Sequence, residues 1–252
     1  MIYFLSDAHL GCRALSSRRT RERRLVRFLD SIKSKASAVY LLGDMFDYWF
    51  EFRQVVPKGY VRFLGKLAEL TDNGVEVHFF IGNHDIWCKD YLSKECGVIM
   101  HYEPCTMECD GKVFFMAHGD GLGDGDRKFY FLRKIFHSSF CQKAFYCLHP
   151  DTSVALGLKW ASNSRRKHEM KGAPAYQGEE NEPLVAYSRT YLADHSEVNY
   201  FIYGHRHIEL DLAIGDESRL VILGDWVDKF SYAVFDGETL SLNRYIEGET
   251  CL

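Results

Sequence analysis

Short apolar runs recur along this chain, and most of them stop at a glycine, an aspartate or a histidine. Each run has the length and the branched or aromatic content of a buried strand. The predicted strands are Ile2–Leu5, Ala38–Leu42, Val75–Ile81, Val113–Ala117, Tyr200–Tyr203, Leu220–Leu223 and Tyr232–Phe235. Two segments with helical periodicity, Arg21–Ile32 and Tyr60–Leu70, separate the first three runs. This alternation predicts an α/β fold with right-handed crossovers and a largely parallel central sheet, followed by a more antiparallel half.

Length and charge exclude several classes of protein. The 252 residues suffice for one large domain, or for one domain with an elaboration. A net charge of −4 gives no reason to expect nucleic-acid binding by bulk attraction. Asp7 ends the first apolar run, so we expect no signal peptide, and no run is long enough for a transmembrane helix. The eight cysteines contain no C-x-x-C pair, and we expect reduced thiols.

One segment differs from the rest in its charge. Arg127–Lys171 holds ten Lys or Arg against two acids, whereas the remainder of the chain holds 21 basic and 33 acidic residues. Its stretch KFYFLRKIFHSSFCQKAFYCLH carries apolar residues on more than one helical face. We therefore predict a core of residues 1–126 and 196–252, with residues 127–195 as a helical insertion. In one interpretation, the insertion is a helical excursion with a solvated basic face. In the other, it is a lid that binds an anionic ligand with apolar chains or touches a membrane.

Five strand endings carry side chains that bind metal ions. They read SDAHLG, LLGDMFD, FIGNHDIW, MAHGDG and IYGHRHI, and they contain Asp7, His9, Asp44, Asn83, His118, His205 and His207. Because ligands bind at the carboxyl ends of strands in open α/β sheets, we expect these endings to converge on one site. Two Asp, one Asn and four His suit Mn²⁺, Fe²⁺ or Zn²⁺ better than Ca²⁺ or Mg²⁺. Seven ligands predict two ions that share a bridging carboxylate, activate a water and hold phosphoryl oxygens.

The spacing within these motifs supports the same interpretation. In the D-x-H pair Asp7 and His9, as in the two histidines of GHRH, residues i and i+2 point the same way from an extended segment. Glycines precede Asp44, Asn83 and His205, and they permit tight turns and close backbone approach to an anion. Each motif alone is weak evidence, because a lone GNHD is compatible with an ordinary turn. All five in this order favour a metal site.

The ordered set D-x-H, GD, GNHD, HGD and GH-x-H resembles the calcineurin-like metallophosphoesterases, from Asp7 to His207. The resemblance implies a four-layer α/β/β/α sandwich. It implies that one metal is held by Asp7, His9 and His207, that the second is held by Asn83, His118 and His205, and that Asp44 bridges them. His84 would stabilise the transition state or protonate the leaving oxygen, and Asp85 would orient His84. Water is then the nucleophile, without a covalent intermediate on the protein.

Further features narrow the resemblance to one family. The chain resembles the UDP-2,3-diacylglucosamine diphosphatases of lipid A biosynthesis in four features. These are the early D-x-H, Asp126 eight residues after His118, the helical insertion, and LGDW at 223–226. This implies water attack on the α-phosphorus, giving UMP and 2,3-diacylglucosamine 1-phosphate, with Mn²⁺ in the site. It implies a cytoplasmic enzyme, peripheral on the bacterial inner membrane, whose insertion shelters the acyl chains. Implied substrate contacts are Asn83, His84, Asp126, Ser164, His168, Lys171 and His205.

The chain departs from that family at two places. His84 stands where the best-known branch has arginine, and His168 replaces an amide. A metallophosphoesterase acting on another nucleotide diphosphate or phosphodiester, nucleic acid included, therefore stays open; a nuclease would need an open basic groove with stacking aromatics. A non-catalytic scaffold is the third alternative, but such scaffolds typically lose ligands, and here all are present. We expect no nucleic acid and no obligate protein partner.

Overall fold

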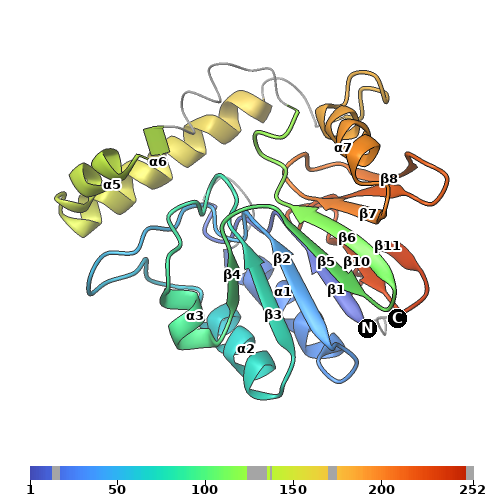
Figure 1. The fold of residues 1–252 in the computed structure, drawn as a ribbon. Coiled ribbons are helices and arrows are strands. Elements are labelled where there is room, and N and C mark those ends of the chain that lie inside the picture. Colours follow the sequence, from blue (N-terminus) through green and yellow to red (C-terminus); the bar gives the residue numbers. More distant parts are fainter. Residues whose placement is uncertain (13–17, 124–134, 137, 170–174, 248–252) are drawn as a thin grey trace.

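Two β-sheets form the centre of the molecule, and helices cover their outer faces (Figure 1). This computed structural model describes residues 1–12, 18–123, 135–136, 138–169 and 175–247. The first sheet has the order β11-β10-β1-β2-β3-β4, with β1 Ile2–Leu5, β2 Ala38–Leu42, β3 Glu76–Phe80, β4 Ile99–His101, β10 Ser231–Phe235 and β11 Leu240–Arg244. The second has the order β5-β6-β7-β9-β8, with β5 Cys105–Cys109, β6 Lys112–Ala117, β7 Val198–Tyr203, β8 Glu209–Ala213 and β9 Arg219–Leu223.

Apolar residues on both faces of the first sheet explain the layering. On β1, Ile2 and Phe4 face the second sheet, whereas Tyr3 and Leu5 belong to the core beneath the helices. That helical core includes residues of α1 Arg18–Ile32, α2 Val61–Asp72 and α3 Tyr91–Cys96. Because successive side chains of a strand point to opposite faces, a wholly apolar strand must be covered on both sides. The predicted sandwich of two sheets between helical layers is confirmed.

Strand directions agree with the prediction in the first sheet and only in part in the second. β1, β2, β3 and β4 pair in parallel, as the helical crossovers require. The second half of the chain is not simply antiparallel, because β6, β7 and β9 also pair in parallel. Its antiparallel strands are β5 and β8 at the edges of the second sheet, and β10 and β11 in the first. The parallel pairs send the ends of β6 and β7 to the same edge.

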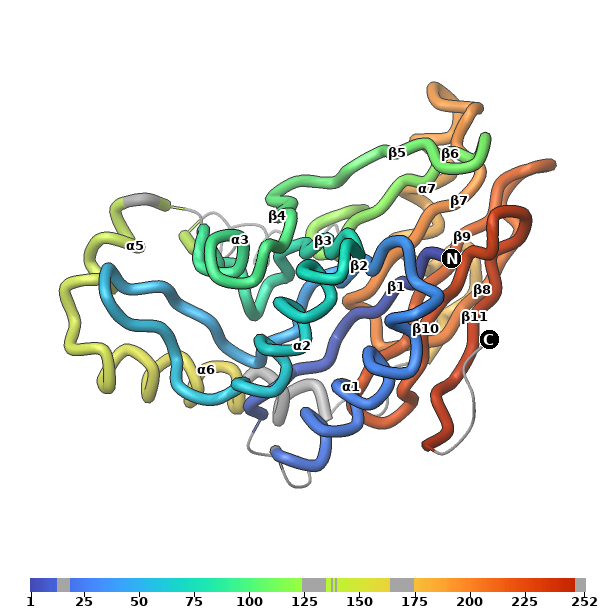
Figure 2. Tube along the Cα trace, turned by 90° about the horizontal axis from the view of Figure 1, so that it is seen from below, coloured from blue at the N-terminus to red at the C-terminus, as the bar shows by residue number. Residues whose placement is uncertain are grey.

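The helix α7, Pro183–Asp194, belongs to the outer layer of the second sheet. Leu184 and Val185 are buried in a core with Phe115, Phe201 and other residues of β6, β7 and β9. The predicted insertion, residues 127–195, therefore includes a helix of the core. The other described helices of that range, α5 Ser139–Tyr146 and α6 Pro150–Glu169, lie together away from β8–β11 in both views (Figure 2). We call α5 and α6 the lid helices.

The lid helices contact the loops that follow β2 and β3. Tyr48, Phe50 and Trp87 form an apolar cluster with residues of both helices, among them Phe145 and Leu158. The Trp87 Nε1–H donates a 2.9 Å hydrogen bond to the carbonyl oxygen of Phe136. Gly157 permits the close approach, because a Cβ at this position would lie 2.1 Å from a ring carbon of Tyr48. The lid helices are thus packed onto loops that also carry the predicted metal ligands.

Two sequence expectations concern membranes and thiols. Among the described residues, we find no helix whose length and apolar content would let it cross a bilayer. The seven cysteines within the described ranges form no disulfide.

Candidate metal centre

The predicted metal ligands all follow strands, and they come from both sheets. Asp7 and His9 follow β1, Asp44 follows β2, and Asn83 follows β3 in the first sheet. From the second sheet, His118 follows β6, and His205 and His207 follow β7. The backbone joins these endings directly, since Asp7 N–H donates to the Gly43 carbonyl and Gly204 N–H donates to the His118 carbonyl. The five endings therefore converge, as predicted, where the edges of two sheets meet.

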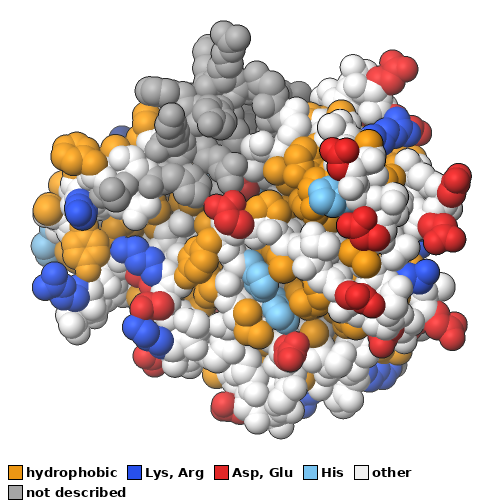
Figure 3. Space-filling model, in the orientation of Figure 1, with side chains coloured by type: hydrophobic (Ala, Val, Ile, Leu, Met, Phe, Trp, Pro, Cys, Tyr) orange, Lys and Arg blue, Asp and Glu red, His pale blue; other side chains and the backbone are white. Residues whose placement is uncertain are grey.

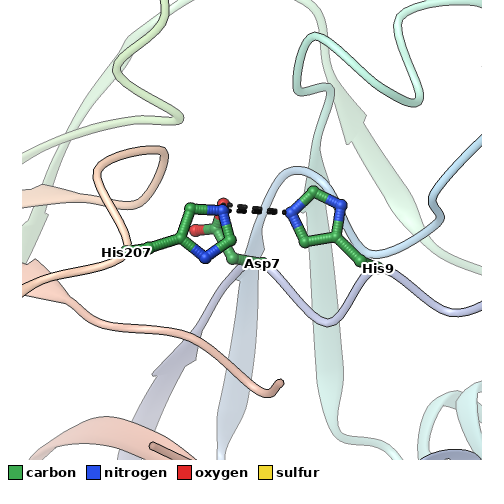
Figure 4. Close-up of side chains that lie close together, drawn as sticks. All are labelled: Asp7, His9 and His207. Atoms are coloured by element: carbon green, nitrogen blue, oxygen red, sulfur yellow. Dashed lines mark hydrogen bonds and ion pairs between the residues drawn. The ribbon is translucent and has the colours of Figure 1, made fainter. Parts of the chain in front are cut away.

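One group of ligands lies around the end of β1. The Nε2 atoms of His9 and His207 are 3.2 Å apart, and they lie 3.7 and 3.4 Å from Asp7 Oδ1. Figure 4 shows the His9 ring facing the Asp7 carboxylate and the His207 ring, which overlap in this view. Asp7 Oδ1 is buried and makes no hydrogen bond, whereas Oδ2 accepts one from the backbone N–H of His205. Two imidazole nitrogens and a carboxylate oxygen within this distance match the donor set of a divalent transition metal.

A second group surrounds Asp44. Its Oδ2 lies 3.4 Å from His118 Nε2 and 3.8 Å from His9 Nε2, so this carboxylate touches both groups. His118 Nε2 is also 3.3 Å from Asn83 Oδ1, and the His205 ring lies 5.1 Å from the His118 ring. Gly82 is required here, because a Cβ would lie 2.3 Å from Asp44 Oδ1. The donors fit a pair of divalent cations that share Asp44.

Strained backbone presents these side chains. Asp7, His9, Asp44, His205 and His207 all have positive φ, between 42° and 65°. Non-glycine residues rarely adopt this left-handed region, and such strain concentrates at functional sites. The predicted reason for the D-x-H spacing is therefore wrong: Asp7 and His9 do not lie in an extended segment. They reach the same site because both residues are left-handed.

Each of three imidazoles turns its Nδ1 toward an oxygen and its Nε2 toward the site. His118 Nδ1 lies 2.8 Å from the Leu42 carbonyl oxygen. His9 Nδ1 lies 3.5 Å from Asp47 Oδ1, and His207 Nδ1 lies 3.5 Å from Asp225 Oδ2. Such acceptors hold the proton on Nδ1 and leave Nε2 as the metal-binding atom. Sequence reasoning missed Asp47 and Asp225, although Asp225 follows β9 in a Gly-Asp pair like that of Asp44.

Electrostatics keep the ligand carboxylates charged. Burial alone would raise the pKa of Asp7, but His207 and His9 outweigh burial and lower it. Burial likewise opposes ionisation of Asp44, yet His118 and His84 hold its pKa well below the ordinary value. The carboxylate of Asp44 in turn raises the pKa of His118 against the effect of burial. Asp7 and Asp44 are therefore carboxylates at neutral pH, the form that binds cations.

His84 and Asp85 directly follow Asn83 in the GNHD motif, but their contacts differ from the expected pairing. The Asp85 carboxylate accepts hydrogen bonds from the backbone N–H groups of Gly82, Asp44, Met45 and Phe46. The His84 ring instead lies against Asp47, whose carbonyl oxygen is 2.9 Å from His84 Nδ1. Burial, with the charge of Asp44, raises the pKa of Asp85 to about 7. The contacts make Asp85 an organiser of the loops after β2 and β3, and Asp47 the residue that orients His84.

Four of the expected substrate contacts lie outside what the structure describes. Asp126 and Lys171 lie outside the described residues. Ser164 and His168 belong to α6, but the described part of the chain does not include their side chains. The structure thus places the seven predicted metal ligands, together with His84 and Asp85.

Substitution of Asp225 tests the metal centre without replacing a metal ligand. Its carboxylate also accepts hydrogen bonds from the backbone N–H groups of Val227, Asp228 and Lys229, and an Asn oxygen can keep these. We expect Asp225→Asn to weaken metal binding by about 10- to 100-fold, because the acceptor facing His207 loses its charge. The dissociation constant for Mn²⁺, measured by competition with a chelator, checks this. Asp228→Asn, at an exposed neighbour, should leave it unchanged; equal constants for both variants would remove Asp225 from the centre.

Comparison with known proteins agrees with this geometry. The family model described as calcineurin-like phosphoesterase matches residues 1–209. A protein of Porphyromonas gingivalis named UDP-2,3-diacylglucosamine hydrolase is 45% identical over 251 aligned residues, and the match covers 96% of this chain and 96% of that one. A Haemophilus influenzae protein of the same name is 27% identical over 230 residues, covering 89% of this chain and 90% of that one. The similarity therefore includes the insertion as well as the strand endings.

Proposed function

Because the chain belongs to the calcineurin-like phosphoesterase family and is a metal-dependent hydrolase, we propose that its substrate is UDP-2,3-diacylglucosamine. The reaction is hydrolysis of the diphosphate by water attack on the α-phosphorus, which gives UMP and 2,3-diacylglucosamine 1-phosphate. The observation that carries the proposal is the 45% identity to a UDP-2,3-diacylglucosamine hydrolase across 96% of both chains. A match of this extent includes the lid helices, which a match to the catalytic motifs alone would not.

The contacts support the following proposed roles for the site residues. Asp7, His9 and His207 hold one divalent cation, Asn83, His118 and His205 hold the second, and Asp44 is shared by both. The cations, for which we propose Mn²⁺, supply Lewis-acid polarisation of phosphoryl oxygens and activation of water. His84 contacts the phosphoryl group in the transition state. Its Nδ1 proton is engaged by the Asp47 carbonyl, so Nε2 is the atom that acts on the substrate.

The lid helices suit a substrate with an acyl part. Phe140, Leu156 and Trp160 are exposed on them and Leu148 is exposed in the turn between them; Phe140 has 78% of its surface in solvent. Lys143 and Lys159 are exposed on the same helices, and Figure 3 shows hydrophobic and basic side chains side by side over this region. Exposed aromatics beside cations favour an interface with anionic lipid. The protein would then act at the cytoplasmic face of the inner membrane, with Asp126 contacting the sugar and with Ser164, His168 and Lys171 as further substrate contacts.

Purified protein loaded with Mn²⁺ should release UMP from UDP-2,3-diacylglucosamine. In water enriched in ¹⁸O, the label should enter the phosphate of UMP, because attack at the α-phosphorus leaves the new oxygen on that product. Mass spectrometry of both products measures this. Label in 2,3-diacylglucosamine 1-phosphate would instead indicate attack at the β-phosphorus.

The matched control substrate is bis-p-nitrophenyl phosphate, a diester without nucleotide or lipid. If the protein cleaves this diester and releases no UMP from the lipid nucleotide, the proposed substrate is wrong. The metal centre would then serve another nucleotide diphosphate or phosphodiester.

A further inference from the structure

A cavity opens beside the metal centre where the two sheets are joined by the chain. It has a volume of about 120 Å³ and is lined by residues at the ends of β3, β4 and β6. Gly82 and His118, from the loops that carry the metal ligands, line it, and so do Tyr102, Glu103 and Pro104. Those three residues are the turn from β4 of the first sheet to β5 of the second. Drug-sized ligands occupy about 300–1,000 Å³, so this cavity takes one ring-sized part of a larger substrate.

The charges of the described lining favour an uncharged hydrogen-bond donor over a phosphate as the occupant of the cavity. Its described lining contains two acids, Glu103 and Asp120, and neither a lysine nor an arginine. His101 also lines it, and burial together with the adjacent His78 lowers the pKa of His101 to about 4, so this ring is neutral. Near Glu103 and Asp120 a phosphate would be repelled, whereas hydroxyl and N–H donors would find acceptors. The occupant is therefore an uncharged group that carries hydrogen-bond donors.

The apolar part of the lining suits a flat ring. Ile81, Ile86, Pro104 and Leu122 supply apolar surface, and Tyr102 is 47% exposed as a residue. The Tyr102 hydroxyl donates a hydrogen bond to the Lys89 carbonyl, which holds the ring in place before a ligand arrives. Figure 3 shows histidine and hydrophobic side chains together near the middle of the face over these strands. An exposed, fixed aromatic ring is a stacking surface for a nucleobase.

We propose that this cavity binds the uracil and ribose of the nucleotide half of the substrate, with the base stacked on Tyr102. The inference rests on the proposed function, because it assumes a substrate with a nucleoside on one side of the reacting phosphorus. His118 and Gly82 place the cavity against the metal ligands, so a nucleoside held here presents its 5′-phosphate to them. The acyl half then extends toward the lid helices.

The test measures binding of UMP and of ribose 5-phosphate, which lacks the base, to the Mn²⁺-loaded protein by isothermal titration calorimetry. We expect UMP to bind about 5- to 150-fold more tightly than ribose 5-phosphate, the range for one stacked base. Tyr102→Ala should weaken the binding of UMP by the same factor and change the dissociation constant of ribose 5-phosphate by less than about threefold. Tyr102→Phe, which keeps the ring, should retain the preference for UMP.

Three results would overturn the assignment. They are equal affinity of the wild-type protein for UMP and ribose 5-phosphate, a UMP affinity unchanged in Tyr102→Ala, and an equal loss of both ligands in that variant. Release of UMP from the lipid nucleotide is measured separately, on the wild-type protein. If UMP is released but its binding does not depend on Tyr102, the cavity assignment fails while the proposed function stands. If UMP binding depends on Tyr102 but no UMP is released from the lipid nucleotide, the lipid substrate is rejected and the nucleoside cavity is kept.

Discussion

Asp44→Asn is expected to reduce turnover by at least about 10³-fold and to lower the bound metal from two ions per chain to one or fewer. Asp44 Oδ2 is the atom close to both His9 and His118, so it is the one carboxylate common to the two groups of ligands. An amide in its place removes the negative charge that two cations would share. A metal pair contributes several kcal/mol of transition-state stabilisation, and each 1.36 kcal/mol corresponds to a tenfold change in rate.

Asn is the appropriate replacement because it preserves the other contact of this side chain. Asp44 Oδ1 accepts a 2.8 Å hydrogen bond from the backbone N–H of His84, and an amide oxygen can still accept it. Metal content by elemental analysis and turnover with bis-p-nitrophenyl phosphate are the two measurements. The matched control is Asp216→Asn, in the exposed turn between β8 and β9, which should change neither. Two bound ions with turnover near that of the wild type would remove Asp44 from the shared position.

The location of the metal centre was predictable from sequence because its ligands are local to strand ends. Asp7 and His9, for example, are two to four residues beyond the wholly apolar run Ile2–Leu5, and a buried strand fixes where such residues emerge. The Gly-Asp and Gly-Asn pairs repeat this arrangement on β2 and β3. What links them is the parallel pairing of the strands, which a strand–helix–strand order already implies.

The conformation of the ligands could not be predicted in the same way. Left-handed backbone is signalled by glycine, but Asp7, His9 and Asp44 adopt it without that signal. Only the surrounding contacts impose it, such as the hydrogen bond from the His9 N–H to the Asp44 carbonyl. Strain of this kind depends on tertiary structure, and periodicity carries no information about it.

The boundary of the insertion was missed for a related reason. Charge composition separates residues 127–171 from the rest of the chain, but α7 lies beyond that basic segment and differs from it in its packing. Leu184 and Val185 are apolar, but the sequence does not show which surface they pack against. The structure shows that these two residues pack on β6 and β7, so that α7 covers the second sheet. The composition of a helix does not show which part of the protein it packs against.

The variant His84→Ala is expected to keep both metal ions and to lose about 10²- to 10⁴-fold in turnover, as removal of a general acid or a transition-state donor does. Its ring stands edge-on to the His9 ring, with centroids 4.8 Å apart, which places it at the rim of the ligand group. Burial lowers its pKa, although Asp44 and Asp47 favour the charged form. The loss should appear in turnover, while the dissociation constant for Mn²⁺ stays within about threefold.

Two further substitutions distinguish the two ring nitrogens of His84. An Asn side chain can donate to the Asp47 carbonyl as Nδ1–H does, but it has no group at the position of Nε2. The turnover of His84→Asn should therefore be as low as that of His84→Ala. A Gln side chain reaches further and places an amide near Nε2, so His84→Gln should recover part of the lost turnover. If Asn restores activity and Gln does not, the contact with Asp47 is what matters, and His84 acts by fixing the loop after β2. The expected order, Gln above Asn and Ala, assigns the chemistry to Nε2, the nitrogen that the Asp47 contact leaves available to the substrate.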